Sequence, residues 1–334
     1  MPLSKVRKIG NDNVTAIGYG AMGIAAFYGS IQPDEERLAV LDALYAKGCT
    51  NWDTSNIYGD SEVLIGKWFK KTGKRNEIFL ATKFGLTNKP ERPTNGEPEY
   101  VKECIRKSLE RLGVDYVDLY YLHRPDPTVP IEKTVGAMAE LVKEGKVRYL
   151  GLSECTANDI RRAHAVHPIS AIQVEYSLFE LDIESPQTDI LRTARELGIA
   201  VVAYSPLGRG LLTGQYKSPD DFEPGDFRRT VPRFSRENFP RILELVETVG
   251  TIGKKYNATP GQVALAWLLA QGDDIIPIPG TRKIKYLEEN LGALDLELEA
   301  ADIQEIRRLC ENVRLGDRYD PARMKLVQQE TPPL

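Results

Sequence analysis

Short apolar runs recur along this chain and alternate with longer amphipathic segments. Most of the runs are nearly continuously apolar or β-branched, which is typical of strands covered on both faces. We therefore predict a strand over each run. The runs lie at residues 14–18, 49–53, 78–83, 117–122, 149–153, 171–176, 200–204 and 275–279.

The segments between these runs carry helical signals. Residues 34–47 follow Pro33, have acidic residues in the first turn and stop at Gly48. Residues 99–112 place their apolar side chains on one stripe. Signals of this kind predict helices at 34–47, 61–71, 99–112, 131–144, 157–166, 188–197, 240–256, 260–270, 283–293 and 299–311.

The order of these elements favours one closed barrel. Each predicted strand is followed by at least one helix, and eight such units in about 300 residues are typical of a (β/α)8 barrel. We predict an α/β fold of this class, a TIM barrel with an extra C-terminal helix, in which residues 1–334 form a single domain. From the pattern alone, a doubly wound open sheet remains the alternative.

One long polar stretch, residues 205–239, separates the last two predicted strands. Loops of this length inside a compact domain are uncommon and usually functional. In a barrel, the loops that follow the strands build the active site. We therefore predict a long active-site loop at 205–239.

Composition excludes several classes of partner. The chain has 44 Lys and Arg residues against 48 Asp and Glu residues, a net charge of −4, which gives no basic footprint for nucleic acid or an acidic membrane. Its apolar runs fall short of the roughly 20 residues that span a bilayer. The N-terminus lacks the apolar core of a secretory signal. We expect no nucleic-acid or membrane partner, a cytoplasmic location, and a monomer by default, with an oligomer as the alternative.

The cysteines give no sign of a disulfide framework or a metal site. The four cysteines are widely spaced and form no CxxC pair. Reduced thiols are the simplest interpretation and agree with a cytoplasmic location. We predict no metal, because the sequence offers no cluster of metal ligands.

Two familiar motifs fail in their context. Residues 18–23 spell GxGxxG after a predicted strand, but the next predicted helix begins only after Pro33. A dinucleotide-binding turn needs a helix to open there, so we interpret these glycines as tight backbone at a barrel mouth. Residues 151–155 resemble the nucleophile turn of a serine hydrolase but lack its final glycine.

Four polar residues form a more specific group. Asp53, Lys83 and His123 end the second, third and fourth predicted strands, and Tyr58 follows Asp53 by five residues. Taken singly, each has a structural explanation as a cap, a solvated strand end or a loop residue. A barrel brings them to one face, and a lysine that follows apolar residues needs a partner such as Asp53.

This group suits proton donation to a carbonyl oxygen. A phenol has a pKa of about 10 in water, and a nearby ammonium lowers it. Tyr58 would then act as a general acid tuned by Lys83 and Asp53. His123 would orient the carbonyl by a hydrogen bond. None of these residues can donate a hydride, so the chemistry requires a cofactor.

An ordered set of motifs carries a family resemblance: WDTSNIYG, ATKFG, LYYLHRPD, YLGLSE, IQVEYS, AYSPLGRG and IPGTRK. With them, the chain resembles the aldo-keto reductase superfamily over most of its length. The resemblance implies a (β/α)8 barrel whose base is closed by a short N-terminal β-hairpin. It implies a catalytic tetrad at Asp53, Tyr58, Lys83 and His123, hydride transfer from NADPH to an aldehyde or ketone, and no metal.

The same resemblance implies the residues that bind NADPH. Ser153 and Gln173 would hold the nicotinamide carboxamide, and Tyr204 would stack on the ring. Arg282 and Lys283 open a predicted helix where the 2′-phosphate would bind. The implied set also contains Met22, Asp53, Ser205, Pro206, Leu207, Gly208, Gly210, Gly280, Thr281, Glu289 and Asn290. Many relatives have Asn after the serine, and this chain departs from them with Glu154.

The resemblance also implies a pocket for a small aldehyde or ketone. Its walls would include Phe27, Tyr28, Asn56, Tyr58, Phe84 and His123. Two other functions stay open. One is a noncatalytic NADPH-binding module of the same fold, like the β subunits of potassium channels. The other is a barrel glycoside hydrolase that uses Asp53 and Glu175, although Lys83 would neutralise Asp53.

Overall fold

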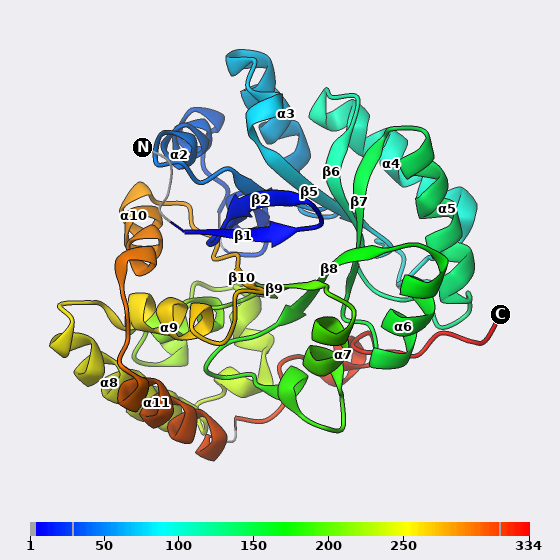
Figure 1. The fold of residues 1–334 in the computed structure, drawn as a ribbon. Helices are drawn as coiled ribbons and strands as arrows, with labels where there is room; N and C mark the ends of the chain where they lie inside the picture. The colour runs from blue at the N-terminus through cyan, green and yellow to red at the C-terminus, as the bar shows by residue number, and fades with distance from the viewer. Residues whose placement is uncertain (1–4, 29, 314) are drawn as a thin grey trace.

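Eight parallel strands form one curved sheet at the centre of the protein (Figure 1). The computed structural model describes residues 5–28, 30–313 and 315–334. Each strand of the sheet pairs with the next one along the chain. The strands are β3 (Tyr19–Gly20), β4 (Asn51–Asp53), β5 (Phe79–Phe84), β6 (Val117–Leu122), β7 (Val147–Ser153), β8 (Ile169–Glu175), β9 (Ala200–Tyr204) and β10 (Ile275–Pro277).

Backbone hydrogen bonds between the two ends of the sheet close it into a barrel. Gly18 N donates to Pro277 O at 3.0 Å, and Gly20 N donates to Pro279 O at 3.3 Å. A Cβ on Gly280 would lie 2.6 Å from Gly20 O, so the two chain segments meet closely because neither carries a side chain there. The barrel prediction is confirmed, and the open sheet is excluded.

Helices surround the sheet (Figure 1). Each predicted helix is present, with ends that differ from the prediction by no more than two residues, including the extra C-terminal helix. The helices are α2 (Asp34–Ala46), α3 (Ser61–Thr72), α4 (Pro98–Leu112), α5 (Ile131–Lys143), α6 (Ala157–Val166), α7 (Ile190–Glu196), α8 (Phe239–Lys255), α9 (Pro260–Leu269), α10 (Ile284–Gly292) and α11 (Ala300–Asn312). A short helix, α12 (Pro321–Met324), follows.

Local sequence signals explain where several helices begin and end. Gly113 follows α4 with a left-handed φ of 63°, a conformation that glycine adopts without strain. Helix α9 begins with a capping box, in which Thr259 and Gln262 satisfy each other's backbone N–H groups. Such signals are local, so they could be recognised from the sequence alone.

An antiparallel hairpin of β1 (Val6–Ile9) and β2 (Asp12–Thr15) crosses the base of the barrel, in front of the strands in Figure 1. Its Ile9 and Val14 are buried in one cluster with inward side chains of the barrel. The hairpin therefore plugs the base with apolar groups, and the predicted N-terminal hairpin is confirmed.

The first predicted strand, residues 14–18, was wrong in its position. Val14 and Thr15 belong to the hairpin, and the first barrel strand is β3, which is only two residues long. The run is apolar because it passes under the barrel, where Ala16 and Ile17 are fully buried. A one-turn helix, α1 (Met22–Ala25), follows β3 and was not predicted.

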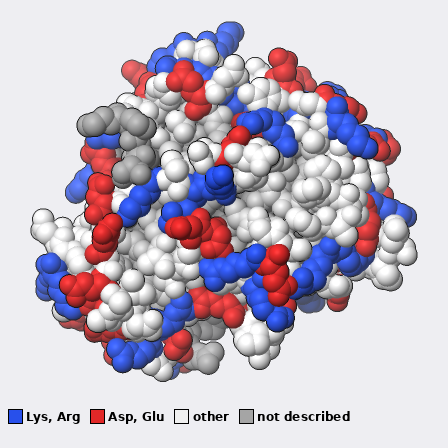
Figure 2. All heavy atoms as spheres, in the orientation of Figure 1, with Lys and Arg blue, Asp and Glu red and all other residues white. Residues whose placement is uncertain are grey.

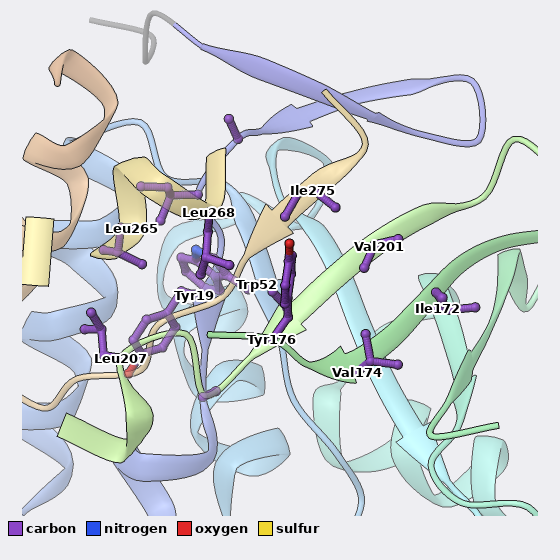
Figure 3. Close-up of a cluster of buried hydrophobic side chains, with 14 of the residues drawn as sticks. Tyr19, Trp52, Ile172, Val174, Tyr176, Val201, Leu207, Leu265, Leu268 and Ile275 are labelled. Atoms are coloured by element: carbon purple, nitrogen blue, oxygen red, sulfur yellow. The ribbon is translucent and has the colours of Figure 1, made fainter. Parts of the chain in front are cut away.

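The barrel strands divide their side chains between two apolar regions. Outward side chains pack against the helices, and Figure 3 shows part of this layer with Ile172, Val174, Val201 and Ile275. Inward side chains form a second cluster inside the barrel. Because successive strand residues point to opposite faces, the inward positions of each strand can be followed to its carboxyl end, where the polar candidates lie.

The outer surface carries charges of both signs. On the hairpin face, Lys and Arg side chains are interspersed with Asp and Glu (Figure 2). This mixture agrees with the near balance of 44 basic and 48 acidic residues. Among the described residues, no helix is long and apolar enough to cross a membrane.

The long loop after β9 folds as a series of short 3-10 helices: η3 (Gly208–Thr213), η4 (Pro219–Asp221), η5 (Phe227–Thr230) and η6 (Pro232–Phe234). Arg228 organises it by donating to Asp226 Oδ2 at 2.7 Å. The Arg228 guanidinium also lies 4.5 Å from the Phe222 ring centroid and 5.2 Å from that of Tyr28. These contacts connect the loop to the segment between β3 and α2.

Candidate active site

Strand alternation brings three of the predicted tetrad residues to the inside of the barrel. On β5, Phe79 and Ala81 belong to the inner cluster, so Lys83 continues the inward row. On β6, Leu119 and Tyr121 do the same, and His123 follows them. Asp53 ends β4 and pairs in register with Ala81. The carboxyl ends of neighbouring strands therefore hold a carboxylate, an ammonium and an imidazole.

Lys83 and Asp53 form a buried ion pair. Lys83 Nζ donates to Asp53 Oδ1 and, at 2.7 Å, to Thr54 O. The Lys83 side chain is fully buried. Burial lowers the pKa of Lys83 and raises the pKa of Asp53, and in each case the charge of the partner counteracts the burial. Asp53, which the sequence suggested as the partner of Lys83, therefore does pair with it in the structure.

Tyr58 lies beside this pair in the loop after β4. Its hydroxyl is 3.4 Å from His123 Nε2, and Lys83 Nζ is 4.9 Å from its ring centroid. Burial raises the pKa of Tyr58, and the Asp53 carboxylate raises it further, whereas Arg124 lowers it. The expected lowering by Lys83 does not dominate, because Asp53 balances the charge of the ammonium.

His123 is held from both sides. Ser55 Oγ lies 3.1 Å from His123 Nδ1, while Nε2 faces the Tyr58 hydroxyl. Burial lowers the pKa of His123 well below its usual value, and the charges of Lys83 and Arg124 lower it further. The imidazole is therefore neutral at physiological pH.

The predicted nicotinamide-binding residues lie on the three strands that follow. Ser153, Gln173 and Tyr204 end the inward rows of β7, β8 and β9 or lie near their ends. Gln173 Nε2 donates to Asp53 Oδ2 at 2.8 Å, and Ser153 Oγ accepts from Arg124 Nη1 at 3.2 Å. The structure thus brings the tetrad and this part of the predicted cofactor site together.

The Glu154 carboxylate, which stands where the family resemblance implies an Asn, is occupied by contacts within the protein. Both of its carboxylate oxygens accept from Arg318, at 3.1 and 2.7 Å. Its Oε1 also accepts from Glu175 N at 3.0 Å. Burial raises the pKa of Glu154, but Arg318 and Arg124 outweigh that effect, so the net pKa lies below the ordinary value. Glu154 is thus an ionised, fully engaged carboxylate.

The predicted pyrophosphate loop has an unusual backbone. Ser205, Gly208, Arg209 and Gly210 all have positive φ values, of 51°, 53°, 56° and 94°. Pro206 and Leu207 between them are buried. Left-handed turns of this kind point successive N–H groups in one direction, as in anion-binding nests. Two of these N–H groups are used within the loop, since Gly208 N donates to Ser205 O at 2.9 Å and Gly210 N to Leu207 O at 3.0 Å, and the phosphate site stays a prediction.

The predicted 2′-phosphate residues lie after β10. Gly280 packs closely against Gly20, where the barrel closes. Thr281 O accepts a hydrogen bond from the Tyr19 hydroxyl at 2.9 Å. Arg282 Nη1 donates to Ser30 O at 2.8 Å on the surface. Lys283 is the N-cap residue of α10, without a side-chain cap. The positive turn therefore stands at the N-terminus of α10, where the helix dipole favours anions.

The two residues predicted at the adenine edge lie on α10. Asn290 is buried on this helix. Glu289 Oε1 accepts from Thr259 Oγ1 at 2.8 Å, so this carboxylate already connects α10 to the start of α9. Glu289 therefore has a structural role besides any contact with a cofactor.

The predicted substrate residues divide into two groups. Phe27 is exposed, has a strained φ of 71°, and packs its ring edge-on against Tyr58 at 6.5 Å between centroids. Tyr28 follows it, and Met22 begins α1 just after β3. These residues lie around the mouth.

Phe84 and Asn56 are directed away from the mouth. Phe84 follows the inward Lys83, so it points outward, where it is fully buried and stacks on Tyr120 at 4.8 Å between centroids. Asn56 Nδ2 donates to Cys104 Sγ at 3.8 Å, on α4. The structure therefore gives no support to these two as pocket walls.

Several residues at the mouth were missed from the sequence. Arg124 donates to His123 O at 2.7 Å as well as to Ser153. Arg209 lies between the rings of Phe227 and Tyr319, at 5.2 and 5.1 Å from their centroids. Its place in the SPLGRG motif was the signal that could have pointed to it. Arg124 sits in LYYLHRPD, whereas residues after 311 fall in no recognised motif.

Comparison with known proteins assigns this barrel to a family. A sequence model of the Aldo/keto reductase family matches residues 16–311. This chain belongs to the aldo/keto reductase family. It is therefore an oxidoreductase of that family, and the resemblance seen in the sequence is confirmed.

Two aldo-keto reductases from fungi are similar over nearly the whole chain. One is aldo-keto reductase str7 of Strobilurus tenacellus, 62% identical, with 100% of this chain and 99% of that protein covered. The other is aldo-keto reductase yakc [NADP(+)] of Schizosaccharomyces pombe, 54% identical, with 98% of each chain covered.

Solved structures show the same architecture. A thermostable aldo-keto reductase in complex with the inhibitor epalrestat is 29% identical, with a TM-score of 0.73 over 92% of this chain and all of that one. The glycerol dehydrogenase of Gluconobacter oxydans is 26% identical, with a TM-score of 0.82 over 95% of this chain and 98% of that one.

Proposed function

We propose that this aldo/keto reductase transfers a hydride from NADPH to an aldehyde or ketone, with Tyr58 as the general acid. One observation carries the proposal. A phenol, a neutral imidazole and a Lys83–Asp53 ion pair lie together at the carboxyl ends of the strands, and Gln173 connects that ion pair to the predicted nicotinamide site. Barrel enzymes place their chemistry at this face.

The residues present fit NADPH. Arg209 has a buried Nη2 without a hydrogen-bond partner among the described residues. It stands in a loop whose left-handed turns suit an anion, so the cofactor's pyrophosphate would satisfy a polar atom that otherwise has no partner. Arg282 and Lys283 add positive charge where a 2′-phosphate would bind. The name of the fungal relative yakc includes NADP(+), which agrees with this choice of cofactor.

When bound, NADPH supplies the hydride that no side chain can supply. Tyr58 would give its hydroxyl proton to the carbonyl oxygen as negative charge develops there. The raised pKa of Tyr58 keeps the phenol protonated and ready to donate. The Lys83 ammonium, 4.9 Å from the Tyr58 ring centroid, would stabilise the phenolate that remains.

His123 would position the substrate. Because its imidazole is neutral, the nitrogen that faces Tyr58 can carry a hydrogen for a carbonyl oxygen bound between the two side chains. Ser55, on the other ring nitrogen, fixes the orientation of the ring. Together with Asp53 and Lys83, the Tyr58 and His123 side chains would bind and polarise the carbonyl group.

A panel of aldehydes and ketones tests the proposal. NADPH oxidation is followed by absorbance with the purified protein, and the alcohol products are identified. We expect turnover with at least some aldehydes and much weaker use of NADH. If NADPH binds but no carbonyl compound is reduced, the noncatalytic binding module is the better description. If neither cofactor binds, the proposal is wrong.

A further inference from the structure

Two carboxylates at the ends of adjacent strands hold one arginine from the C-terminal segment, residues 315–334. Glu154, just after β7, binds both terminal nitrogens of Arg318 at 3.1 and 2.7 Å. Glu175, at the end of β8, lies 3.6 Å from Arg318 Nη1. We call Glu154, Glu175 and Arg318 the carboxylate clamp.

The clamp is almost completely removed from solvent. The side chains of Glu154, Glu175 and Arg318 are 0%, 4% and 7% exposed. Charges buried to this extent are stable only when they are paired and hydrogen-bonded. Glu154 meets this condition with Arg318 and with the backbone N–H of Glu175. Glu154 therefore depends on a residue that lies more than 140 positions further along the chain, whereas Glu175 forms an ion pair with Arg318 and a second one with Arg233.

The same strand end holds the C-terminal segment at a second point. Glu154 O accepts from Gln328 N at 2.9 Å, so one residue binds the segment through its side chain and through its backbone. Glu154 also has a left-handed φ of 54°. This conformation is uncommon outside glycine, and strain of this kind persists where surrounding contacts over-determine it.

Further anchors lie on either side of the clamp. Before it, Asn238 Nδ2 donates to Leu315 O at 2.9 Å. After it, Thr331 binds Asp159 on α6 through its N–H at 2.9 Å and its hydroxyl at 2.8 Å. The C-terminal segment thus runs from the start of α8 to α6 (Figure 1), and the clamp holds its middle.

The long loop reaches the clamp through Arg233. Its guanidinium donates to Glu175 Oε1 at 3.4 Å and to Glu180 Oε2 at 2.6 Å, and its side chain is buried. Glu175 is therefore the point at which an arginine of the loop and an arginine of the C-terminal segment meet. The long loop and the C-terminal segment thus contact the same carboxylate, that of Glu175.

Tyr319, the residue after Arg318, contacts both a strand-end residue and the long loop. The Tyr319 hydroxyl lies 3.2 Å from the hydroxyl of Tyr204, the predicted nicotinamide-stacking residue. The Tyr319 ring also lies 6.5 Å from the Phe227 ring, between centroids. Tyr319 therefore faces the strand-end residues and the long loop at once.

We propose that Glu154 and Glu175 are positioning residues that hold the C-terminal segment over the barrel mouth through Arg318, and that Tyr319, fixed in this way, determines which substrates fit. The inference rests on the proposed reductase function. It gives Glu154 a role that differs from the cofactor contact that the family resemblance implies at this position. Ser153 and Gln173, which neighbour the two carboxylates in the sequence, remain the predicted carboxamide contacts.

Hydrogen exchange tests the seating without reference to activity. The variants are Glu154→Gln, Arg318→Met and the double variant, with Lys325→Met as a control that removes an exposed charge from the same segment. Amide exchange is measured by mass spectrometry on the full chain. Loss of a charged hydrogen bond should speed exchange in residues 317–328 by roughly tenfold or more, while the barrel strands and the control stay unchanged.

The double variant keeps the test interpretable if a single variant unfolds. Removing one member leaves a buried charge unpaired, which is strongly destabilising. The double variant removes two opposite charges together and leaves Glu175 paired with Arg233, so it should melt nearer the parent than Glu154→Gln does. If exchange in 317–328 is unchanged in the folded double variant, the clamp does not seat the segment and the proposal fails.

Steady-state kinetics test the consequence for specificity. With the double variant and with Tyr319→Ala, KM should rise more for bulky aromatic aldehydes than for a small aldehyde, and Tyr319→Ala and the double variant should shift this ratio in the same direction. NADPH affinity should also be retained. If NADPH affinity falls and exchange does not change, Glu154 contacts the cofactor and the proposal is overturned. If the parent reduces no carbonyl at all, the proposed function has failed, and the exchange result still decides the seating.

Discussion

Gln173 donates a hydrogen bond from Nε2 to Asp53 Oδ2 at 2.8 Å, and this bond connects the predicted carboxamide site to the Lys83–Asp53 ion pair. Both side chains are buried. A movement of the Gln173 amide toward a cofactor would therefore lengthen or break its hydrogen bond to Asp53. The predicted cofactor site and the proposed acid–base group thus share one hydrogen-bonded network.

Replacement of Gln173 should affect two properties together. In Gln173→Leu, Asp53 loses one partner and the carboxamide loses another. Because hydrogen bonds to charged groups contribute about 1.5–3 kcal/mol, we expect a loss of unfolding free energy of that order and weaker NADPH binding. Chemical denaturation and fluorescence titration measure the two effects. A stable variant with unchanged NADPH affinity would show that the shared network is not used.

Replacing Lys83 tests whether its charge sets the pKa of Tyr58. In Lys83→Met, the Asp53 carboxylate is no longer balanced, so the pKa of Tyr58, already raised by burial, should rise further. The acid becomes weaker, turnover falls, and the alkaline limb of the pH–rate profile moves to higher pH. Lys83→Arg, which keeps the positive charge, is the control. A Lys83→Met profile that coincides with the parent's would contradict the tuning role.

His123 should make stability depend on pH. Burial, together with the charges of Lys83 and Arg124, lowers its pKa in the folded protein, whereas the unfolded chain takes up a proton near its ordinary value of about 6.5. Below that pH the unfolded state binds more protons, so stability falls as pH falls. Thermal melting between pH 7.5 and about 5.5 should show a smaller loss for His123→Gln than for the parent. His167→Gln, at the end of α6, serves as the control, and equal losses in all three proteins would exclude this role.

Most of the fold was accessible from the sequence because its signals are local. Apolar runs indicated the strand positions, and glycines or capping residues indicated the helix ends, so the ends of each predicted helix agree with the structure to within two residues. The first strand was misplaced because β3 has only two residues, and the apolar run before it serves the hairpin. An apolar run in the sequence does not show whether its residues lie in the hairpin under the barrel or in a strand of the barrel itself.

The grouping of Asp53, Lys83 and His123 could be predicted for a similar reason. Each of the three lies at or just after the carboxyl end of a recognisable strand, and the barrel topology brings strand ends together. Arg318 could not be found in this way, because its partners Glu154 and Glu175 are distant in the sequence and no motif surrounds it. Phe84 was misjudged because the motif ATKFG does not show that Lys83 and Phe84 point to opposite faces.

Arg282 tests the choice of cofactor. A guanidinium grips a phosphate through charge-assisted hydrogen bonds, so Arg282→Ala should weaken NADPH binding by about 10- to 150-fold. NADH, which has no 2′-phosphate, should be nearly unaffected. Fluorescence quenching gives both dissociation constants. In the structure Arg282 also holds Ser30 O, so equal weakening of both cofactors would assign it to the loop instead of the phosphate.

The central claim is that Tyr58 donates the proton while NADPH delivers the hydride to a carbonyl carbon. Its most direct test uses NADPH deuterated at the transferable position of the nicotinamide, an aldehyde substrate, and mass spectrometry of the alcohol. The parent should place one deuterium on the former carbonyl carbon. Tyr58→Phe should still bind NADPH but form this product on the order of 10²–10⁴-fold more slowly. Near-normal deuterium transfer by Tyr58→Phe, or product without deuterium from the parent, would contradict the account.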